Sequence, residues 1–164
     1  MTVSYRRVVI SEFGDADVLR LIEEPALPEP GPGEVRVRVL VTSAAFTDTL
    51  VRRGKFPGIR RKMLPFSPGF DMVGVVDMFG EGVVSPRLGW RVVALTVTGA
   101  YSEYVCLPAE QTVPVPERLG TAEAVSLVLS YVAAYQMLRR VAKVQPGDRI
   151  LVHGAGGAVG TALL

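Results

Sequence analysis

Cysteine is almost absent from this sequence, and the shortage limits the folds that it can support. Cys106 is the single cysteine among 164 residues, so no disulfide can form within the chain. A small secreted domain held together by disulfides is therefore excluded. The cysteine usage fits a reducing compartment, and we expect a cytoplasmic protein.

Long apolar runs and a strong net charge are absent as well. The longest apolar stretch, residues 124–138, includes two serines, two tyrosines and a glutamine, and it is shorter than the roughly 20 residues that span a bilayer. The net charge is only +2, which is too small to attract nucleic acid by its field alone. We therefore expect no membrane span and no nucleic-acid partner.

Residues 1–120 contain short β-rich runs that are separated by proline and glycine. This pattern predicts a mainly β domain, built as a barrel or a sandwich. Residues 34–42 alternate apolar and charged side chains, as a half-buried strand does. The expected strands are residues 7–10, 19–22, 34–42, 71–79, 91–97 and 101–107, with a short helix over 47–53.

The residue pattern changes near residue 120, from short β-rich runs to an apolar helical pattern, and we place a domain boundary there. Thr121 is a plausible N-cap for an apolar helix over residues 122–142. A strand over residues 149–153 is expected next, followed by a glycine-rich turn that opens a second helix. A helix that is apolar on nearly every side needs a covering layer, so we expect homo-oligomers that bury it.

The glycine-rich turn reads Ala155-Gly-Gly-Ala-Val-Gly160, a variant of the dinucleotide-binding pattern. In one interpretation, such a turn only reverses the direction of the chain tightly and binds nothing. After a strand and before a helix, however, it favours contact between a cofactor pyrophosphate and backbone N–H groups. The expected contact residues are Gly156, Gly157, Ala158, Val159 and Gly160. Residues 121–164 would form only the beginning of such a domain, because a doubly wound sheet needs several more strands.

Four parts of the sequence carry a family resemblance: residues 34–42, residues 64–76, residues 99–105 and the glycine-rich turn. In this order they resemble the medium-chain dehydrogenase/reductase superfamily. The zinc-free quinone oxidoreductase branch, with its vesicle amine transport protein-like members, is the most similar. The resemblance implies a GroES-like β-barrel catalytic domain over residues 1–120, followed by a truncated Rossmann α/β domain over residues 121–164. It also implies NADPH bound in the cleft between the two domains.

The resemblance also indicates which side chains would form the site. Zinc-dependent relatives hold their catalytic metal at the positions of Ala45 and Phe70, and neither side chain can ligate a metal. We therefore expect no zinc. Phe46 and Thr47 match the loop beside the nicotinamide, although Thr47 can equally cap a helix. The remaining expected residues are Ala133 near the nicotinamide, and Leu50, Phe56 and Phe70 around the substrate.

The function implied for the whole protein is hydride transfer from NADPH to a quinone, an enone or a related carbonyl compound. Quinone-reductase relatives often carry polar side chains at the positions of Ala45, Leu50, Phe56 and Ala133, and all four are apolar here. No catalytic residue is therefore assigned. A binding or adaptor protein that keeps the fold without the chemistry is the alternative, and residues 1–164 alone are expected to be inactive.

Overall fold

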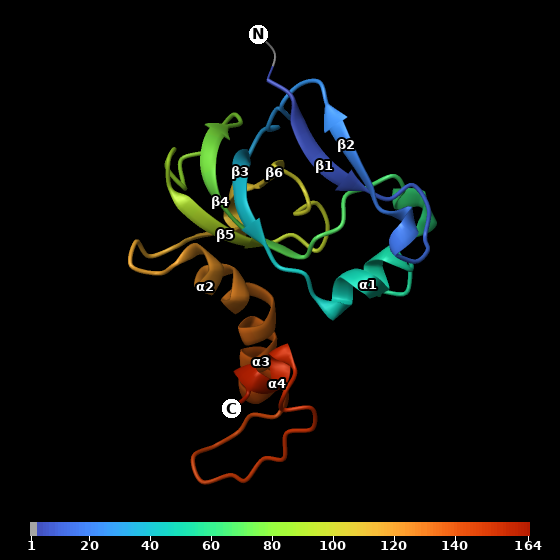
Figure 1. The fold of residues 1–164 in the computed structure, drawn as a ribbon. Helices are drawn as coiled ribbons and strands as arrows, with labels where there is room; N and C mark the ends of the chain where they lie inside the picture. The colour runs from blue at the N-terminus through green and yellow to red at the C-terminus, as the bar shows by residue number, and fades with distance from the viewer. Residues whose placement is uncertain (1–2) are drawn as a thin grey trace.

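The computed structural model describes residues 3–164, and two antiparallel β-sheets occupy most of its N-terminal part (Figure 1). The smaller sheet pairs β1 (Tyr5–Val9) with β2 (Arg20–Glu24). The larger sheet has the order β6-β3-β4-β5-β7. Its strands are β3 (Glu34–Thr42), β4 (Asp71–Phe79), β5 (Arg91–Leu95), β6 (Tyr104–Pro108) and β7 (Thr112–Pro114). The predicted mainly β architecture is confirmed.

Alternation along β3 places its apolar side chains in the core, as the sequence predicts. Val35 and Val37 are fully buried and pack with Met72 of β4 and Leu107 of β6. Arg36 points to the other face, where its guanidinium forms an ion pair of 2.9 Å with Asp77. The strand is therefore half-buried, with one apolar and one charged face.

The strand ladder does not close over the described residues, whereas the family resemblance implies a β-barrel. Two isolated bridges, Arg7 to Ser102 and Ile10 to Phe66, connect the smaller sheet to neighbouring segments. The larger sheet is open, with β6 and β7 at its edges. Because β7 has only three residues and ends in Pro114, which has no N–H to donate, it is poorly suited to continue the ladder.

The first α-helix, α1 (Phe46–Arg52), follows β3 and lies beside the sheets (Figure 1). Three short 3₁₀ turns connect other elements of this part of the chain. They are η1 (Ala16–Val18), η2 (Arg61–Met63) and η3 (Ala109–Gln111).

The predicted helix over residues 122–142 is present, but it alternates between α- and π-helical turns. We call residues 121–141 the helical arm, because they lead away from the sheets (Figure 1). Its N-cap is Gly120 and not Thr121, and the Gly120 N–H donates to the Glu123 carboxylate at 2.9 Å. The arm consists of α2 (Thr121–Ser126), η4 (Leu127–Tyr131), α3 (Val132–Tyr135) and η5 (Gln136–Val141).

The prediction of a strand over residues 149–153 is wrong. The segment has no strand pairing, and Ile150 and Leu151 are 50% and 82% exposed. A strand needs a neighbour that accepts and donates its backbone hydrogen bonds, and the described residues supply none at this place. After the glycine-rich turn, α4 (Ala158–Ala162) packs against η4 and α3.

Candidate functional site

The loop before α1 is held by the carboxylate of Asp48. One oxygen of this side chain accepts the Ala45 N–H at 2.7 Å, while the Asp48 N–H donates to the Ala45 carbonyl at 3.1 Å. An acidic residue in the first turn also suits the positive end of the helix. Because Ala45 is the N-cap, the hypothesis that Thr47 caps this helix is wrong.

Asp71, the first residue of β4, holds the same loop from its other end. Its buried carboxylate accepts hydrogen bonds from the Ser43 N–H at 3.0 Å and from the Ser43 hydroxyl at 2.7 Å. The hydroxyl of Thr42 donates to the Asp71 carbonyl at 2.7 Å. Two carboxylates that are 23 residues apart in the sequence therefore fix the loop that leads into α1, whose first residues are Phe46 and Thr47.

Burial makes the charged form of the Asp48 carboxyl less favourable than it is in water. The side chain is 8% exposed, and burial raises the pKa of its carboxyl, with a smaller contribution from the charge of Asp71. The Ala45 N–H and the Tyr101 hydroxyl act in the opposite direction. Burial and the nearby Asp48 charge also raise the pKa of Tyr101 well above its ordinary value, so the phenol keeps its proton.

Two polar atoms of consecutive residues have no hydrogen-bond partner among the described residues. They are the hydroxyl oxygen of Thr47 and one carboxylate oxygen of Asp48, and both are buried. Unpaired buried polar atoms are rare in folded proteins and call for an explanation. Sequence reasoning selected Thr47 but missed the network of Asp48, Asp71 and Tyr101. An acid three residues after the N-cap was the available signal for Asp48.

The apolar residues expected around the substrate lie in and beside a compact cluster. Phe70 is 4% exposed and packs edge-to-face on Phe56, with ring centres 4.9 Å apart. Leu129 of η4 packs against the same cluster, so the helical arm reaches it. The carbonyl of Leu50 accepts the Phe56 N–H at 3.2 Å and so joins α1 to this cluster.

The other two residues expected near the nicotinamide, Phe46 and Ala133, are not members of this cluster. Phe46, next to the loop, is 76% exposed. Ala133 is half-buried in α3, one turn of the helical arm beyond Leu129. Phe56 and Phe70 thus lie together in the structure, whereas Phe46 faces outward.

The glycine-rich turn has the backbone shape that close approach to a phosphate requires. Gly154 has a positive φ of 74°, and the Gly157 N–H donates to its carbonyl at 2.9 Å. A side chain on the buried Gly160 would overlap that same carbonyl. Gly156 and Gly157 are exposed and present backbone without side chains, so no side chain at these two positions would block a group that approaches the turn.

No three His, Cys, Asp or Glu side chains among residues 3–164 are grouped so that they could hold a metal ion. Ala45 caps α1 through its backbone, and the ring of Phe70 is part of the core. Burial raises the pKa of the Cys106 thiol to about 11. In the same described part of the chain, no helix has the length and apolarity needed to cross a membrane.

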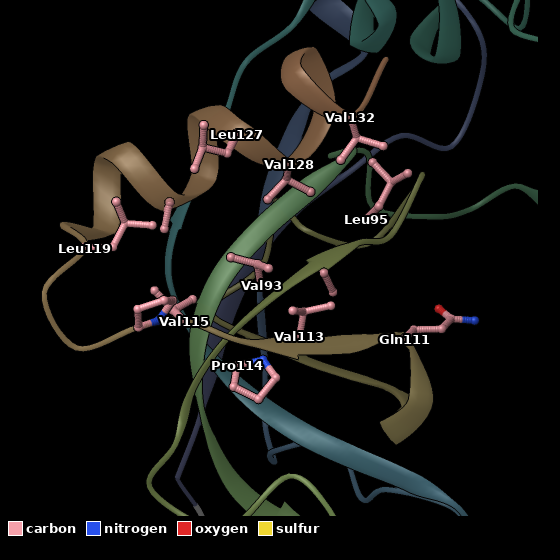
Figure 2. A pocket seen from close by; sticks show the side chains of 13 residues that line it. Val93, Leu95, Gln111, Val113, Pro114, Val115, Leu119, Leu127, Val128 and Val132 are labelled. Carbon is pink, nitrogen blue, oxygen red and sulfur yellow. The ribbon is translucent and has the colours of Figure 1, made fainter. Parts of the chain in front are cut away.

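An apolar groove, separate from these residues, lies between the helical arm and the edge of the larger sheet (Figure 2). Its volume is about 380 Å³, and its walls come from β5, β7, the segment between β7 and the arm, and the arm as far as Val132. Val132 of the arm and Leu95 of β5 lie close together at one end of it (Figure 2). Gln111 is the single polar side chain among those that line it, and no lining side chain is charged.

Comparison with known proteins gives a match to one family model and to several curated proteins. Residues 31–117 match the family model of the alcohol dehydrogenase GroES-like domain. The synaptic vesicle membrane protein VAT-1 homolog of Rattus norvegicus is 39% identical over 160 residues, covering 97% of this chain and 39% of that protein. The quinone oxidoreductase of Homo sapiens is 35% identical over 159 residues, covering 96% and 47%.

A solved structure extends the match to three dimensions. A mycobacterial protein in complex with NADPH superposes with a TM-score of 0.87 at 34% identity, covering 96% of this chain and 48% of that one. The chain therefore spans less than half the length of these three relatives.

Proposed function

Because the chain belongs to the medium-chain dehydrogenase/reductase superfamily, in the branch of the quinone oxidoreductases and VAT-1 homologues, we propose that the complete protein is an NADPH-dependent oxidoreductase. Its proposed substrate is a quinone, an enone or a related carbonyl compound, and its chemistry needs no zinc. The observation that carries the proposal is the match of nearly the whole chain to a protein solved with NADPH. The apolar side chains at Ala45 and Phe70 support the absence of a catalytic metal.

The described residues would bind and orient the reactants. The exposed backbone of Gly156 and Gly157 would hold the pyrophosphate of the cofactor, whose nicotinamide supplies a hydride when bound. The unpaired hydroxyl of Thr47 would donate a hydrogen bond to the cofactor or to the substrate carbonyl. Apolar side chains around Phe56 and Phe70 would exclude water from the reacting carbon.

The first test is oxidation of NADPH by the complete gene product with a panel of quinones and enones. Turnover with at least one member of the panel, at a rate unchanged by a zinc chelator, supports the proposal. Binding of NADPH without turnover of any member would instead support the alternative of a catalytically silent binding or adaptor protein.

The second test concerns Thr47. In the complete gene product, Thr47→Val should lower kcat/KM by about 2-fold to 13-fold, since one hydrogen bond to a reacting group contributes roughly 0.5–1.5 kcal/mol. Thr49→Val is the matched control, because the Thr49 hydroxyl donates within the helix to the Phe46 carbonyl at 2.7 Å. Equal activity of both variants would remove Thr47 from the site.

We also propose that the protein forms homo-oligomers and is cytoplasmic. The apolar side chains exposed on the helical arm support the first statement, with Tyr135 at 62% and Val141 at 78%. The cysteine usage supports the second.

A further inference from the structure

Positive charge is concentrated in residues 52–62, which begin at the end of α1 (Figure 1). We call these residues the basic segment. It holds six of the 18 basic residues of the chain and none of its 16 acidic residues. The remaining 12 basic and 16 acidic residues give the rest of the chain a net charge of −4. The small net charge of the chain is therefore the sum of a strongly basic segment and an acidic remainder.

Most charges of the basic segment have no acidic partner on the protein. Among residues 3–164, Asp15 is the acid that pairs with the segment, at 2.8 Å from Arg53 and 3.9 Å from Arg52. Four exposed basic residues of the segment form no ion pair with the described residues: Lys55, Arg60, Arg61 and Lys62. Four positive charges without a partner repel one another and attract an anion.

The backbone of the basic segment is fixed by hydrogen bonds and by a glycine. The Lys55 N–H donates to the Leu50 carbonyl at 2.8 Å. The Ile59 N–H donates to the Phe56 carbonyl at 3.2 Å. Gly58 has a φ of 89°, a conformation that other residues rarely adopt. The charged side chains therefore project from a defined loop, which lowers the entropy cost of binding an anion among them.

The same segment is part of the apolar cluster that is proposed to exclude water from the reacting carbon. Ile59 is 5% exposed and belongs to this cluster together with Phe70, and Phe56 packs against it. Lys55 precedes Phe56 and Arg60 follows Ile59, and both basic residues are exposed. The segment thus contributes apolar side chains to the cluster and presents its charges to solvent.

This arrangement suits a substrate whose anionic group is separated from its reacting carbon. The carbonyl end would lie at the apolar cluster, and an arm would carry the anion to the exposed charges. A phosphate monoester has a charge of about −1.5 to −2 at pH 7 and accepts paired hydrogen bonds from guanidinium groups. Phosphate therefore matches four unpaired positive charges better than a single carboxylate does.

A long polyanion fits the basic segment less well. Nucleic acid or an anionic bilayer would extend beyond these 11 residues and meet the net negative charge of the rest of the chain, which repels it. A compact phosphate group can bind at the segment without this repulsion.

We propose that the basic segment binds a phosphate on the carrier arm of an α,β-unsaturated thioester, the arm that coenzyme A and phosphopantetheine share. The proposal rests on the oxidoreductase activity proposed above and names a narrower substrate class for it. The double bond would take up a hydride from NADPH at the β-carbon and a proton from water at the α-carbon, which leaves NADP⁺ and an intact saturated thioester. The segment would position this substrate and take no part in the bonds that form.

The test uses the complete gene product, NADPH and thioesters that differ in one phosphate group. Crotonyl-phosphopantetheine should have a kcat/KM at least fivefold above that of crotonyl-pantetheine. Because the contacts are exposed, raising the ionic strength from about 0.02 to 0.2 M should reduce this preference. Crotonyl-CoA should share the preference, and a further gain with it would show that the nucleotide phosphates bind as well, which distinguishes the two carriers.

A double variant tests the residues. Arg60→Gln/Arg61→Gln should lower the preference for crotonyl-phosphopantetheine over crotonyl-pantetheine at least threefold. Arg139→Gln/Arg140→Gln is the matched control, because it also removes two adjacent exposed arginines, at the end of the helical arm. The control should keep the wild-type preference, and an equal loss in both variants would overturn the proposal. Circular dichroism checks that both variants are folded.

Failure of this inference and failure of the proposed function give different results. Turnover of quinones or thioesters without a preference for the phosphate would overturn this inference and leave the oxidoreductase standing. No turnover of any quinone, enone or thioester would overturn both. Binding of RNA or of anionic vesicles that depends on Arg60 and Arg61, without a preference among the thioesters, would overturn the inference in favour of a polyanionic partner.

Discussion

Asp48 shows how a single side chain connects local structure to the candidate site. One of its carboxylate oxygens accepts the Ala45 N–H and so shapes the start of α1, while the other is buried without a partner beside Thr47. The cap satisfies a backbone donor that would otherwise stay unpaired at the helix start. The same burial makes the charged form of the carboxyl costly.

Asp48 is expected to make stability depend on pH. Burial raises its pKa above the ordinary value of 3.8, so the folded chain holds a proton at this carboxyl more tightly than the unfolded chain does. The contribution of this group to the free energy of unfolding is therefore fully present below pH 3.8 and is lost as the pH rises through the raised pKa. Asp48→Asn, which keeps an acceptor for the Ala45 N–H, removes this loss.

Urea unfolding at several pH values between 4 and 7 measures the effect. The stability of Asp48→Asn relative to wild type should improve as the pH rises. Asp48→Ala is the comparison, because it removes both the titrating group and the acceptor and should cost about 1 kcal/mol. Wild-type and Asp48→Asn curves that run parallel over this range would contradict the assignment.

Among the secondary-structure elements, α4 depends most directly on a single small residue. The helix has five residues, and its first turn is tied to the glycine-rich turn by the Thr161 N–H, which donates to the Gly157 carbonyl at 2.8 Å. Gly160 lies against the carbonyl of Gly154 with no space for a side chain. Close contact between turn and helix therefore requires glycine at position 160.

Gly160→Ala should loosen this contact, because the added methyl group overlaps a backbone atom that cannot move freely. Overpacking of this kind costs roughly 1–3 kcal/mol. Hydrogen exchange of the Thr161 and Leu163 amides should accelerate at least fivefold. Gly156→Ala is the matched control, since a methyl group there meets nothing within 4 Å. Equal exchange rates in both variants would show that the close approach is not needed.

At the scale of the whole molecule, the sheets and the C-terminal segment differ in how much apolar surface they bury. The sheets enclose a core that includes Val35, Val37, Met72 and Val92. The segment that carries the glycine-rich turn has two exposed apolar residues, Ile150 and Leu151, and no strand. Over residues 3–164, α4, which follows the turn, packs against the helical arm, and both sheets of this part of the chain are antiparallel.

The 164-residue chain is therefore expected to bind NADPH very weakly. The turn can offer a few backbone hydrogen bonds, each contributing roughly 0.5–1.5 kcal/mol. Association costs on the order of 4–15 kcal/mol in translational and rotational freedom, which a few such hydrogen bonds do not offset. Calorimetric titration at micromolar cofactor should show no saturable binding. A one-site isotherm with micromolar affinity would contradict this and would point to a site completed by self-association.

The sequence alone determined the features that depend on neighbouring residues. Alternating side chains gave the bounds of β3 correctly, because one face of a strand must be apolar to be buried. The lack of metal-ligating side chains at Ala45 and Phe70 is a matter of residue type and needs no structure. The family motifs, read in order, led to the superfamily that the comparisons confirm.

Only the tertiary structure decided what depends on contacts between distant residues. Ser43 meets Asp71, and Phe56 meets Phe70, through the packing of separate elements. Residues 149–153 have the composition of a strand but form none, because a strand requires a partner that composition cannot supply. The apolar groove likewise exists only because the helical arm leaves the sheet beside β7, a direction set by long-range packing and not by local sequence.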